Sequence, residues 1–272
     1  MKKWLNGKTV VITGASSGIG KQLVKLFVEK CNAKVIGIAR NQEKMEALKK
    51  ELGDKSKNFS YNLFDVSKED NWIEFKNYIT EKNIQITLLV NNAGILPGFT
   101  KFLDVSIEDG KKIMDTNFYS IVYSAYHLMP VIDEKGGVVN ICSSDALLSV
   151  AGTNYYSASK AAVKAFTQSL KHEYKDKYIG CILPGFTDTN IFRNIEMTKK
   201  DKKKIQKFVS PCDVIAKKIF KAIVSRKKYK VVGYDAHIFS LLSRFMPISG
   251  ANIINGVLRK AKVDLFKDAF DK

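Results

Sequence analysis

The sequence lacks the runs and clusters that mark several classes of protein. Its 272 residues contain no stretch of 18 apolar residues, so no transmembrane helix is expected. The apolar run near the start is too short for a signal peptide. Four cysteines, far apart and without a CxxC pair, argue against a disulfide framework and favour reduced thiols in a cytoplasmic protein. Three scattered histidines support neither a metal site nor a histidine-based triad, so we expect no metal.

Acidic residues are scarce relative to basic ones, above all in the last third of the chain. The sequence has 45 Lys and Arg against 27 Asp and Glu, a net charge of +18. Residues 191–272 hold 20 of the basic residues and only 7 of the acidic ones. We interpret this excess as a solvated lysine-rich surface; the alternative is attraction to an anionic membrane or an acidic substrate. No recognition motif accompanies the lysines, so nucleic-acid binding is not expected.

Short apolar runs alternate with stretches of helical periodicity from residue 8 to about residue 183. Strands are predicted at 9–13, 34–39, 58–64, 85–91, 137–143, 178–184 and 228–233. Helices are predicted over 20–30, 41–52, 67–82, 107–132, 155–174 and 214–224. Because most of the strand candidates are apolar without alternation, we expect them to be buried on both faces and paired in parallel. The fold class is therefore α/β, a doubly wound, Rossmann-like parallel sheet in a single domain.

The end of the chain is the least regular part. Residues 197–208 form a lysine-rich segment that we expect to be a mobile surface insertion. Ser210 and Pro211 are typical of a helix start, with serine as the cap and proline in the first helical position. Residues 236–272 form a basic, amphipathic C-terminal helical extension, which either packs on the domain of residues 1–235, contacts a second subunit, covers an apolar substrate as a lid, or binds anionic lipid.

Three glycines stand between the first strand candidate and the first helix. Gly14, Gly18 and Gly20 have the spacing GxxxGxG rather than GxGxxG. Glycine permits unusual backbone angles and lets a pyrophosphate approach the N–H groups at the start of a helix. This pattern alone is weak evidence for a nucleotide site.

Three further motifs strengthen that evidence. They are "NNAG" at 91–94, "YSASK" at 156–160 and "PG" at 184–185, and the predicted fold places them with the glycines at the carboxyl ends of the strands. In this order the four motifs resemble the short-chain dehydrogenase/reductase family over about residues 6–235. The resemblance implies a domain over residues 1–235 that binds a dinucleotide and catalyses hydride transfer.

The candidate catalytic residues centre on a tyrosine and a lysine. Tyr156 and Lys160 are four residues apart on a predicted helix, so the ammonium can stand near the phenol and lower its pKa. The resemblance makes Tyr156 the general acid/base, whereas Tyr155 is expected to serve packing. It also implies a serine beside the substrate oxygen, for which we favour Ser144, with Ser143 as the alternative. Asn117 matches the family's helix asparagine, thought to hold a water that links the lysine to solvent.

The resemblance also places the cofactor. The expected contacts are Gly14, Ser16, Ser17, Gly18, Ile19, Gly20, Arg40, Asp65, Val66, Asn91, Ala93, Gly94, Tyr156, Lys160, Pro184, Gly185, Thr187 and Thr189. Asp65 would accept the adenine amino group, although it could also be an ordinary residue at a helix start. The second strand ends in Ala39, where NAD-preferring members have an acidic residue, and Arg40 follows. Its guanidinium can bind a 2′-phosphate with two hydrogen bonds, so NADP(H) is the expected cofactor.

These features predict an NADP(H)-dependent oxidoreductase that interconverts a carbonyl and a secondary alcohol. The apolar extension favours a steroid-like or long-chain acyl substrate over a sugar. The family implies a homodimer or homotetramer, and the basic tail suggests peripheral contact with an anionic membrane. The alternative is a nucleotide-sensing regulatory or membrane-surface binding protein with little turnover.

Overall fold

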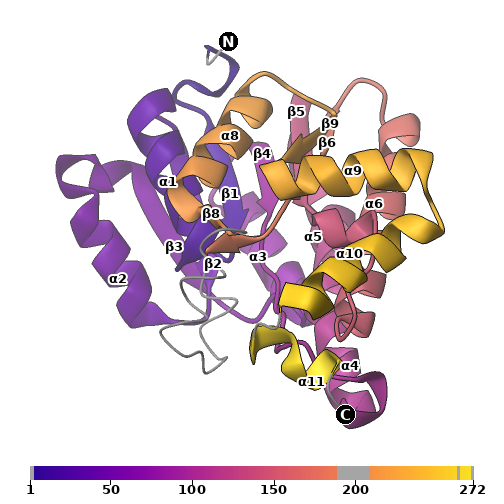
Figure 1. The fold of residues 1–272 in the computed structure, drawn as a ribbon. Coiled ribbons are helices and arrows are strands. Elements are labelled where there is room, and N and C mark those ends of the chain that lie inside the picture. Colours follow the sequence, from indigo (N-terminus) through magenta and orange to yellow (C-terminus); the bar gives the residue numbers. More distant parts are fainter. Residues whose placement is uncertain (1–2, 189–208, 262–263, 271–272) are drawn as a thin grey trace.

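Strands and helices alternate along the chain as the hydrophobic pattern predicts (Figure 1). The computed structural model describes residues 3–188, 209–261 and 264–270. The strands are β1 (Thr9–Thr13), β2 (Lys34–Ala39), β3 (Phe59–Leu63), β4 (Ile86–Asn91), β5 (Ile132–Ile141), β6 (Tyr178–Pro184), β7 (Thr187–Asp188), β8 (Ser210–Pro211) and β9 (Tyr229–Val232). The α-helices are α1 (Gly18–Cys31), α2 (Gln42–Glu51), α3 (Glu69–Glu81), α4 (Ile107–Met114), α5 (Ser120–Leu128), α6 (Asn154–Glu173), α8 (Cys212–Val224), α9 (Tyr234–Phe245), α10 (Ser249–Ala261) and α11 (Lys267–Phe270).

Short helical turns connect several of these elements. They are the 3-10 turns η1 (Lys3–Leu5), η2 (Gly53–Asn58), η3 (Phe102–Asp104), η5 (Met129–Val131), η6 (Ser144–Ala146) and η8 (Asp264–Phe266), and the π turn η4 (Asp115–Tyr119). The sequence predicts a long helical region over 107–132, and the structure confirms it: α4, η4, α5 and η5 follow one another from Ile107 to Val131. The π turn η4 changes the helix type between α4 and α5.

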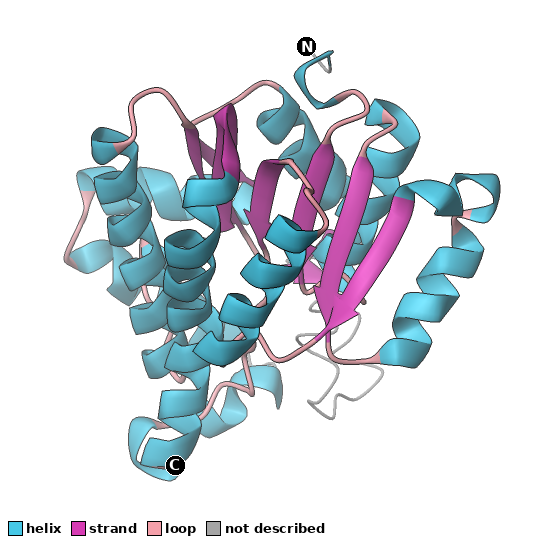
Figure 2. Ribbon diagram, turned by 180° about the vertical axis from the view of Figure 1, so that it is seen from behind, coloured by secondary structure: helices cyan, strands magenta, loops and turns pink. Residues whose placement is uncertain are grey.

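Seven strands form one parallel sheet in the order β3-β2-β1-β4-β5-β6-β9. The order reverses at β1, which pairs with β2 on one side and with β4 on the other. Helices cover both faces of the sheet (Figure 2). The predicted doubly wound α/β fold is therefore confirmed. Strands β7 and β8 form a separate two-stranded sheet.

The core explains why the strands have apolar side chains in succession. On one face, α1, α2 and α8 bury side chains such as Phe27, Met45 and Ile219 against β1 and its neighbours. On the other face, α3 and α5 bury side chains such as Trp72 and Leu128. Because both faces are covered, a strand such as β4 is buried at every position, which leaves its carboxyl end as the place where polar groups can face a ligand.

Helices α2 and α8 start in different ways. The Asn41 side chain caps the start of α2 by accepting a hydrogen bond from the Lys44 N–H, which is a common way to start a helix. Ser210 and Pro211 do not act as the predicted cap and first helical residue. They pair with β7 as strand β8, and α8 begins one residue later at Cys212.

The C-terminal helices pack against the same molecule. Phe239 of α9, Ile254 of α10 and Phe266 form a cluster with Leu96 and Phe99 of the segment that follows β4. In Figure 1, α9 and α10 lie side by side across the front of the view. No helix within the described ranges is long and apolar enough to span a bilayer.

Candidate active site

A pocket opens where the carboxyl ends of β1, β2, β4, β5 and β6 meet. In an open α/β sheet, ligands bind at this edge where the strand order reverses. The predicted site residues that line the pocket are Gly14, Ser16, Ser17, Gly18, Ile19, Arg40, Asp65, Val66, Ala93, Gly94, Ser144, Tyr156, Lys160, Pro184, Gly185 and Thr187. The structure thus brings together residues from seven separated segments of the chain, as the motif order implies.

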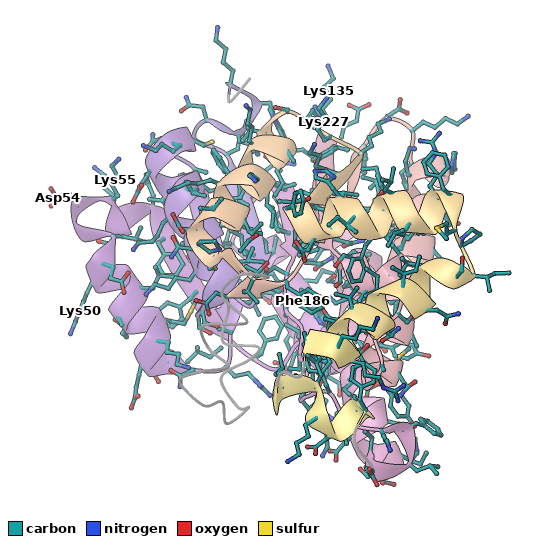
Figure 3. All side chains as sticks on the ribbon, viewed as in Figure 1. Lys50, Asp54, Lys55, Lys135, Phe186 and Lys227 are labelled. Atoms are coloured by element: carbon teal, nitrogen blue, oxygen red, sulfur yellow. The ribbon has the colours of Figure 1, made fainter. Side chains whose placement is uncertain are left out.

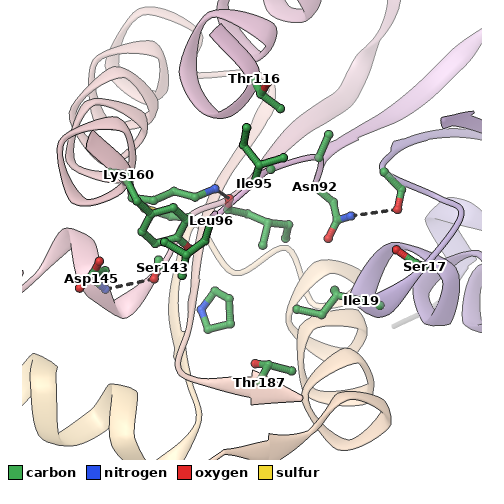
Figure 4. A pocket seen from close by; sticks show the side chains of 18 of the residues that line it. Ser17, Ile19, Asn92, Ile95, Leu96, Thr116, Ser143, Asp145, Lys160 and Thr187 are labelled. Atoms are coloured by element: carbon green, nitrogen blue, oxygen red, sulfur yellow. Dashed lines mark hydrogen bonds between the residues drawn. The ribbon is translucent and has the colours of Figure 1, made fainter. Parts of the chain in front are cut away.

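The glycine loop joins β1 to α1 at one side of this pocket. Gly14 and Gly18 have φ of 65° and 53°, in the left-handed region that favours glycine. The backbone N–H groups in the first turn of α1 have no partners within the helix, so they can bind an anion. Figure 4 shows Ser17 and Ile19 on one side of the hollow and Ser143 and Lys160 on the other.

Gly20 serves packing rather than the pocket. It is buried and is not among the lining residues. A Cβ at this position would lie 2.2 Å from the Gly14 carbonyl oxygen. The missing side chain of Gly20 lets α1 approach the loop closely, and its contact with a cofactor stays a prediction.

The end of β4 is tied to the end of β1. The Thr13 hydroxyl accepts hydrogen bonds from the backbone N–H groups of Asn92 and Ala93, both at 2.9 Å. The Asn92 side chain donates to the Thr13 carbonyl at 3.0 Å and lines the pocket. These bonds fix Ala93 and Gly94 beside the glycine loop.

Asn91, which the sequence predicts as a cofactor contact, is not one of the residues that line the pocket. Its side-chain amide donates to Asn140 at 2.9 Å, and its carbonyl oxygen accepts from Ser124 at 2.9 Å. All three side chains are buried. Asn91 therefore links β4 to β5 and α5 inside the fold, and its neighbour Asn92 takes the place in the pocket that we expected for it.

Arg40 and Asp65 form the rim at the ends of β2 and β3. Their nearest charged atoms are 3.6 Å apart, and Arg40 is largely exposed. Burial would raise the pKa of Asp65, but hydrogen bonds from Ser67 and the nearby Arg40 charge outweigh it, so this pKa lies below its ordinary value. The rim thus has one fixed carboxylate and a guanidinium that is open to solvent.

Tyr156 and Lys160 stand on the first half of α6 and face the pocket. The Lys160 Nζ lies 5.7 Å from the centre of the Tyr156 ring and donates to the Ile141 carbonyl oxygen at 3.2 Å. Burial lowers the pKa of Lys160 and raises that of Tyr156. The expected lowering of the phenol pKa by the lysine is not seen, because burial of the phenol dominates.

The serine beside Tyr156 is Ser143. Its side chain hydrogen-bonds the Tyr156 phenol, which opposes the effect of burial on the phenol pKa. Its oxygen also accepts a hydrogen bond from the Asp145 N–H at 3.1 Å (Figure 4). Ser144, which we favoured, lines the pocket as the first residue of η6, but the hydrogen bond to the phenol comes from Ser143. The structure thus places Ser143, the alternative serine, at the phenol, and the catalytic role of either serine stays a prediction.

Asn117 lies in the π turn between α4 and α5, fully buried. Its side chain accepts from the Ile95 N–H at 2.7 Å and donates to the Ile95 carbonyl at 3.0 Å and to Ser159 at 3.1 Å. Asn117 thus fixes the segment after β4 against α6, which carries Tyr156 and Lys160. It does not line the pocket itself.

Asp145 is a pocket residue that the sequence did not reveal. Its carboxylate accepts hydrogen bonds from the Val150 N–H at 3.1 Å and from the Thr153 and Ser157 hydroxyls, both at 2.9 Å. Burial raises the pKa of Asp145 to about 6, although the three hydrogen bonds oppose that rise. The residue ties the loop after β5 to the first turns of α6.

The segment after β6 forms one wall of the pocket. The Asp235 carboxylate at the start of α9 accepts the Phe186 N–H at 2.6 Å, and burial raises the pKa of Asp235. Gly185 permits this approach, because a Cβ there would lie 2.1 Å from Asp235 Oδ2. Thr187 lines the pocket, whereas Thr189 and the lysine-rich segment 197–208 lie outside the described residues.

The end of the pocket beyond Tyr156 is apolar. It is lined by Leu96, Phe99, Val150 and Phe186, which belong to the cluster that α9 and α10 complete. Sequence reasoning missed these residues, since only the fold brings them together. In the part of the chain that the structure describes, no group of three or more His, Cys, Asp or Glu could hold a metal ion.

Comparison with known proteins gives one family. A model of the short chain dehydrogenase family matches residues 8–200. The 3beta-hydroxysteroid dehydrogenase 2 of Eggerthella lenta is 32% identical over 192 residues, which cover 69% of this chain and 74% of that protein.

Solved structures share the fold. A short chain dehydrogenase/reductase from Burkholderia phymatum in complex with NAD superposes with a TM-score of 0.77 at 21% identity, covering 92% of this chain and 95% of the other. The closed form of a serine dehydrogenase complexed with NADP+ gives a TM-score of 0.69 at 26% identity, covering 79% and 88%.

Proposed function

Because the chain belongs to the short-chain dehydrogenase/reductase family, we propose that it is an NADP(H)-dependent oxidoreductase that interconverts a ketone and a secondary alcohol. The observation that carries the proposal is the convergence of Tyr156, Lys160 and Ser143 on one pocket that also contains the glycine loop. A general acid, a cation and a hydroxyl donor around one point suit a developing alkoxide oxygen.

Tyr156, Ser143 and Lys160 have separate roles at the substrate oxygen. In reduction, the Tyr156 hydroxyl donates its proton to that oxygen, and Ser143 Oγ donates a hydrogen bond to it. Since burial raises the pKa of Tyr156, the phenol is protonated at neutral pH, as a reduction requires. Lys160 supplies the positive charge that stabilises the phenolate left behind. In oxidation the same proton moves back to Tyr156.

The cofactor site fits a phosphorylated dinucleotide. NADPH, when bound, supplies the hydride that adds to the carbonyl carbon. The loop of Gly14 and Gly18 would hold its pyrophosphate at the start of α1. Arg40, exposed and next to the uncharged Ala39, would pair with the 2′-phosphate, and Asp65 would accept the adenine amino group.

The apolar end of the pocket supports an apolar substrate, such as a steroid-like or long-chain acyl ketone. Leu96, Phe99 and Phe186 offer it no charge. The name of the related 3beta-hydroxysteroid dehydrogenase indicates a steroid substrate, whereas the name of the serine dehydrogenase indicates a polar one. We further propose that the chain works as a homodimer or homotetramer in the cytoplasm.

The proposal is tested by following NADPH oxidation at 340 nm with a panel of steroid, acyl and sugar ketones, with NADH in parallel. Tyr156→Phe should lower kcat/KM by about 10²- to 10⁴-fold, because it removes the proton donor. Tyr155→Phe is the matched control, since the Tyr155 ring packs on Gly110 and Phe102 outside the pocket. Turnover that survives Tyr156→Phe, or a preference for NADH, would contradict the corresponding part of the proposal.

A further inference from the structure

Helix α9 carries large apolar side chains on the face that it turns away from the core. Tyr234, Ile238, Leu241 and Phe245 recur at intervals of three and four residues and so form one stripe. Their exposed fractions are 81%, 38%, 61% and 70%. A helix at a water-facing surface normally presents polar residues on this side, so the stripe indicates a contact with something other than water.

The stripe continues into the next helix. Met246 and Ile248 in the connection are exposed, the latter by 86%, as are Ile253 and Val257 of α10. Helices α9 and α10 lie side by side (Figure 1), and the Gly250 N–H at the start of α10 donates to the carbonyl of Met246 in the connection. We call these residues the apolar ridge: Tyr234, Ile238, Leu241, Phe245, Met246, Ile248, Ile253 and Val257.

Packing on the protein core does not account for the ridge. The inner sides of the two helices are already occupied, since Phe239 and Ile254 are buried in the cluster that contains Phe99 and Phe186. Figure 3 shows Phe186 at the centre of the molecule, whereas the labelled lysines project from its rim. The helices are therefore apolar on two sides, one turned to the pocket and one to the exterior.

Apart from Asp235, whose carboxylate accepts the Phe186 N–H, the charged side chains of α9 and α10 are all cations. Between residues 236 and 261 the sequence contains no Asp or Glu, but it contains Arg244, Arg259 and Lys260. All three are exposed, and the Arg244 guanidinium lies 5.7 Å from the Phe245 ring. An apolar helix face flanked by cations is complementary to an anionic lipid surface, where the apolar side chains enter the acyl boundary and the cations meet phosphates.

From this combination we propose that the apolar ridge docks the protein on the surface of an anionic membrane. A second copy of the chain fits the ridge less well. In a two-fold interface the ridge would face a second ridge, so Arg244, Arg259 and Lys260 would meet a surface flanked by the same cations, in a chain of net charge +18. The lipid surface relieves that repulsion and buries the same side chains. The inference rests on the ridge alone and is independent of the proposed activity.

The test is sedimentation of the full chain with vesicles of phosphatidylcholine, with and without phosphatidylglycerol. We expect binding to the anionic vesicles that weakens as salt is raised. The double variant Leu241→Ser/Phe245→Ser should bind at least about tenfold more weakly, because it removes two apolar side chains from the lipid contact. Tyr126→Ser is the matched control: Tyr126 is 75% exposed on α5, which packs against α3.

Circular-dichroism melting of each variant shows that the chain still folds. The proposal is overturned if the wild-type chain stays in the supernatant with anionic vesicles, or if the double variant binds as the wild type does. It is also overturned if the double variant turns a dimer into a monomer in analytical ultracentrifugation while vesicles bind neither protein, which would identify the ridge as a contact between copies.

Discussion

At the scale of single residues, burial controls the ionisable groups of the pocket. It raises the pKa of Tyr156 and of Asp145 and lowers that of Lys160, because each charged form loses contact with water. The Asp145 charge raises the Tyr156 pKa further, whereas the hydrogen bond from Ser143 lowers it. Ser143 is thus the neighbour that favours ionisation of the phenol, and Asp145 is one that opposes it.

Replacing the two serines one at a time should separate their roles. Ser143→Ala should lower kcat/KM by about 10²-fold, since it removes a donor to the developing oxyanion. Ser144→Ala should stay within a few-fold of the wild type. The measurement is ketone reduction at saturating NADPH. The reverse order of effects would restore Ser144 as the catalytic serine.

Asp145 should make stability depend on pH. Its pKa of about 6 in the folded chain exceeds the ordinary value of 3.8, so the folded state holds the proton more tightly. Its contribution to stability is full below about pH 4 and is lost as the pH rises through 6. The wild type should therefore lose stability between pH 4 and pH 7, whereas Asp145→Asn lacks this titrating group. The unfolding free energy of the variant relative to that of the wild type should rise by up to about 2–3 kcal/mol over this range.

Urea unfolding of both proteins at the two pH values measures this gain. The comparison cancels the other titrating groups, which the two proteins share. A difference in stability that does not change with pH would contradict the assigned shift of Asp145.

At the scale of elements, the start of α1 depends on a close approach of helix and loop. The sequence predicted the strand, the glycine turn and the helix, because these are local signals. It did not separate the glycines by role. Gly14 and Gly18 have left-handed φ, whereas Gly20 is required by contact with the Gly14 carbonyl.

Two glycine-to-alanine changes should therefore have opposite effects. Gly20→Ala should destabilise the protein by about 1–3 kcal/mol, since its Cβ would collide with the Gly14 carbonyl. Gly256→Ala in α10 should stabilise it by about 0.5–1 kcal/mol, because alanine favours the helix and, beyond the adjacent residues and the helix's own backbone, no atom of the described residues lies within 4 Å of the added methyl. Thermal melting gives both values. A stable Gly20→Ala protein would show that the loop can move away.

The π turn is a feature that local sequence patterns do not predict. The periodicity of residues 107–132 predicts a long helical region, and the chain is helical from Ile107 to Val131, with a π turn at Asp115–Tyr119 that the periodicity does not predict. The interruption places Asn117 so that its amide bonds both backbone groups of Ile95. That requirement comes from a segment 22 residues away, which no local pattern records.

At the scale of the whole molecule, the sheet and the order of its layers were predictable. Apolar strands alternating with helices leave few arrangements, and four motifs identify one edge of the sheet as the site. The direction in which a side chain points was harder to predict. Asn91 and Asn92 are adjacent, yet Asn91 faces Asn140 in the interior and Asn92 faces the pocket. Asp145 and the apolar end of the pocket become visible only when the loop after β5 packs on α6.

The central claim is that this pocket transfers a hydride to a carbonyl carbon while Tyr156 supplies the proton. The most direct measurement uses NADPH deuterated at C4 on its reactive face with the best ketone of the panel. The alcohol is then analysed by mass spectrometry and NMR. We predict one deuterium on the carbinol carbon, no deuterium on the hydroxyl after exchange into water, and loss of the product with Tyr156→Phe. Failure to reduce any ketone, or an alcohol without deuterium at that carbon, would contradict the account.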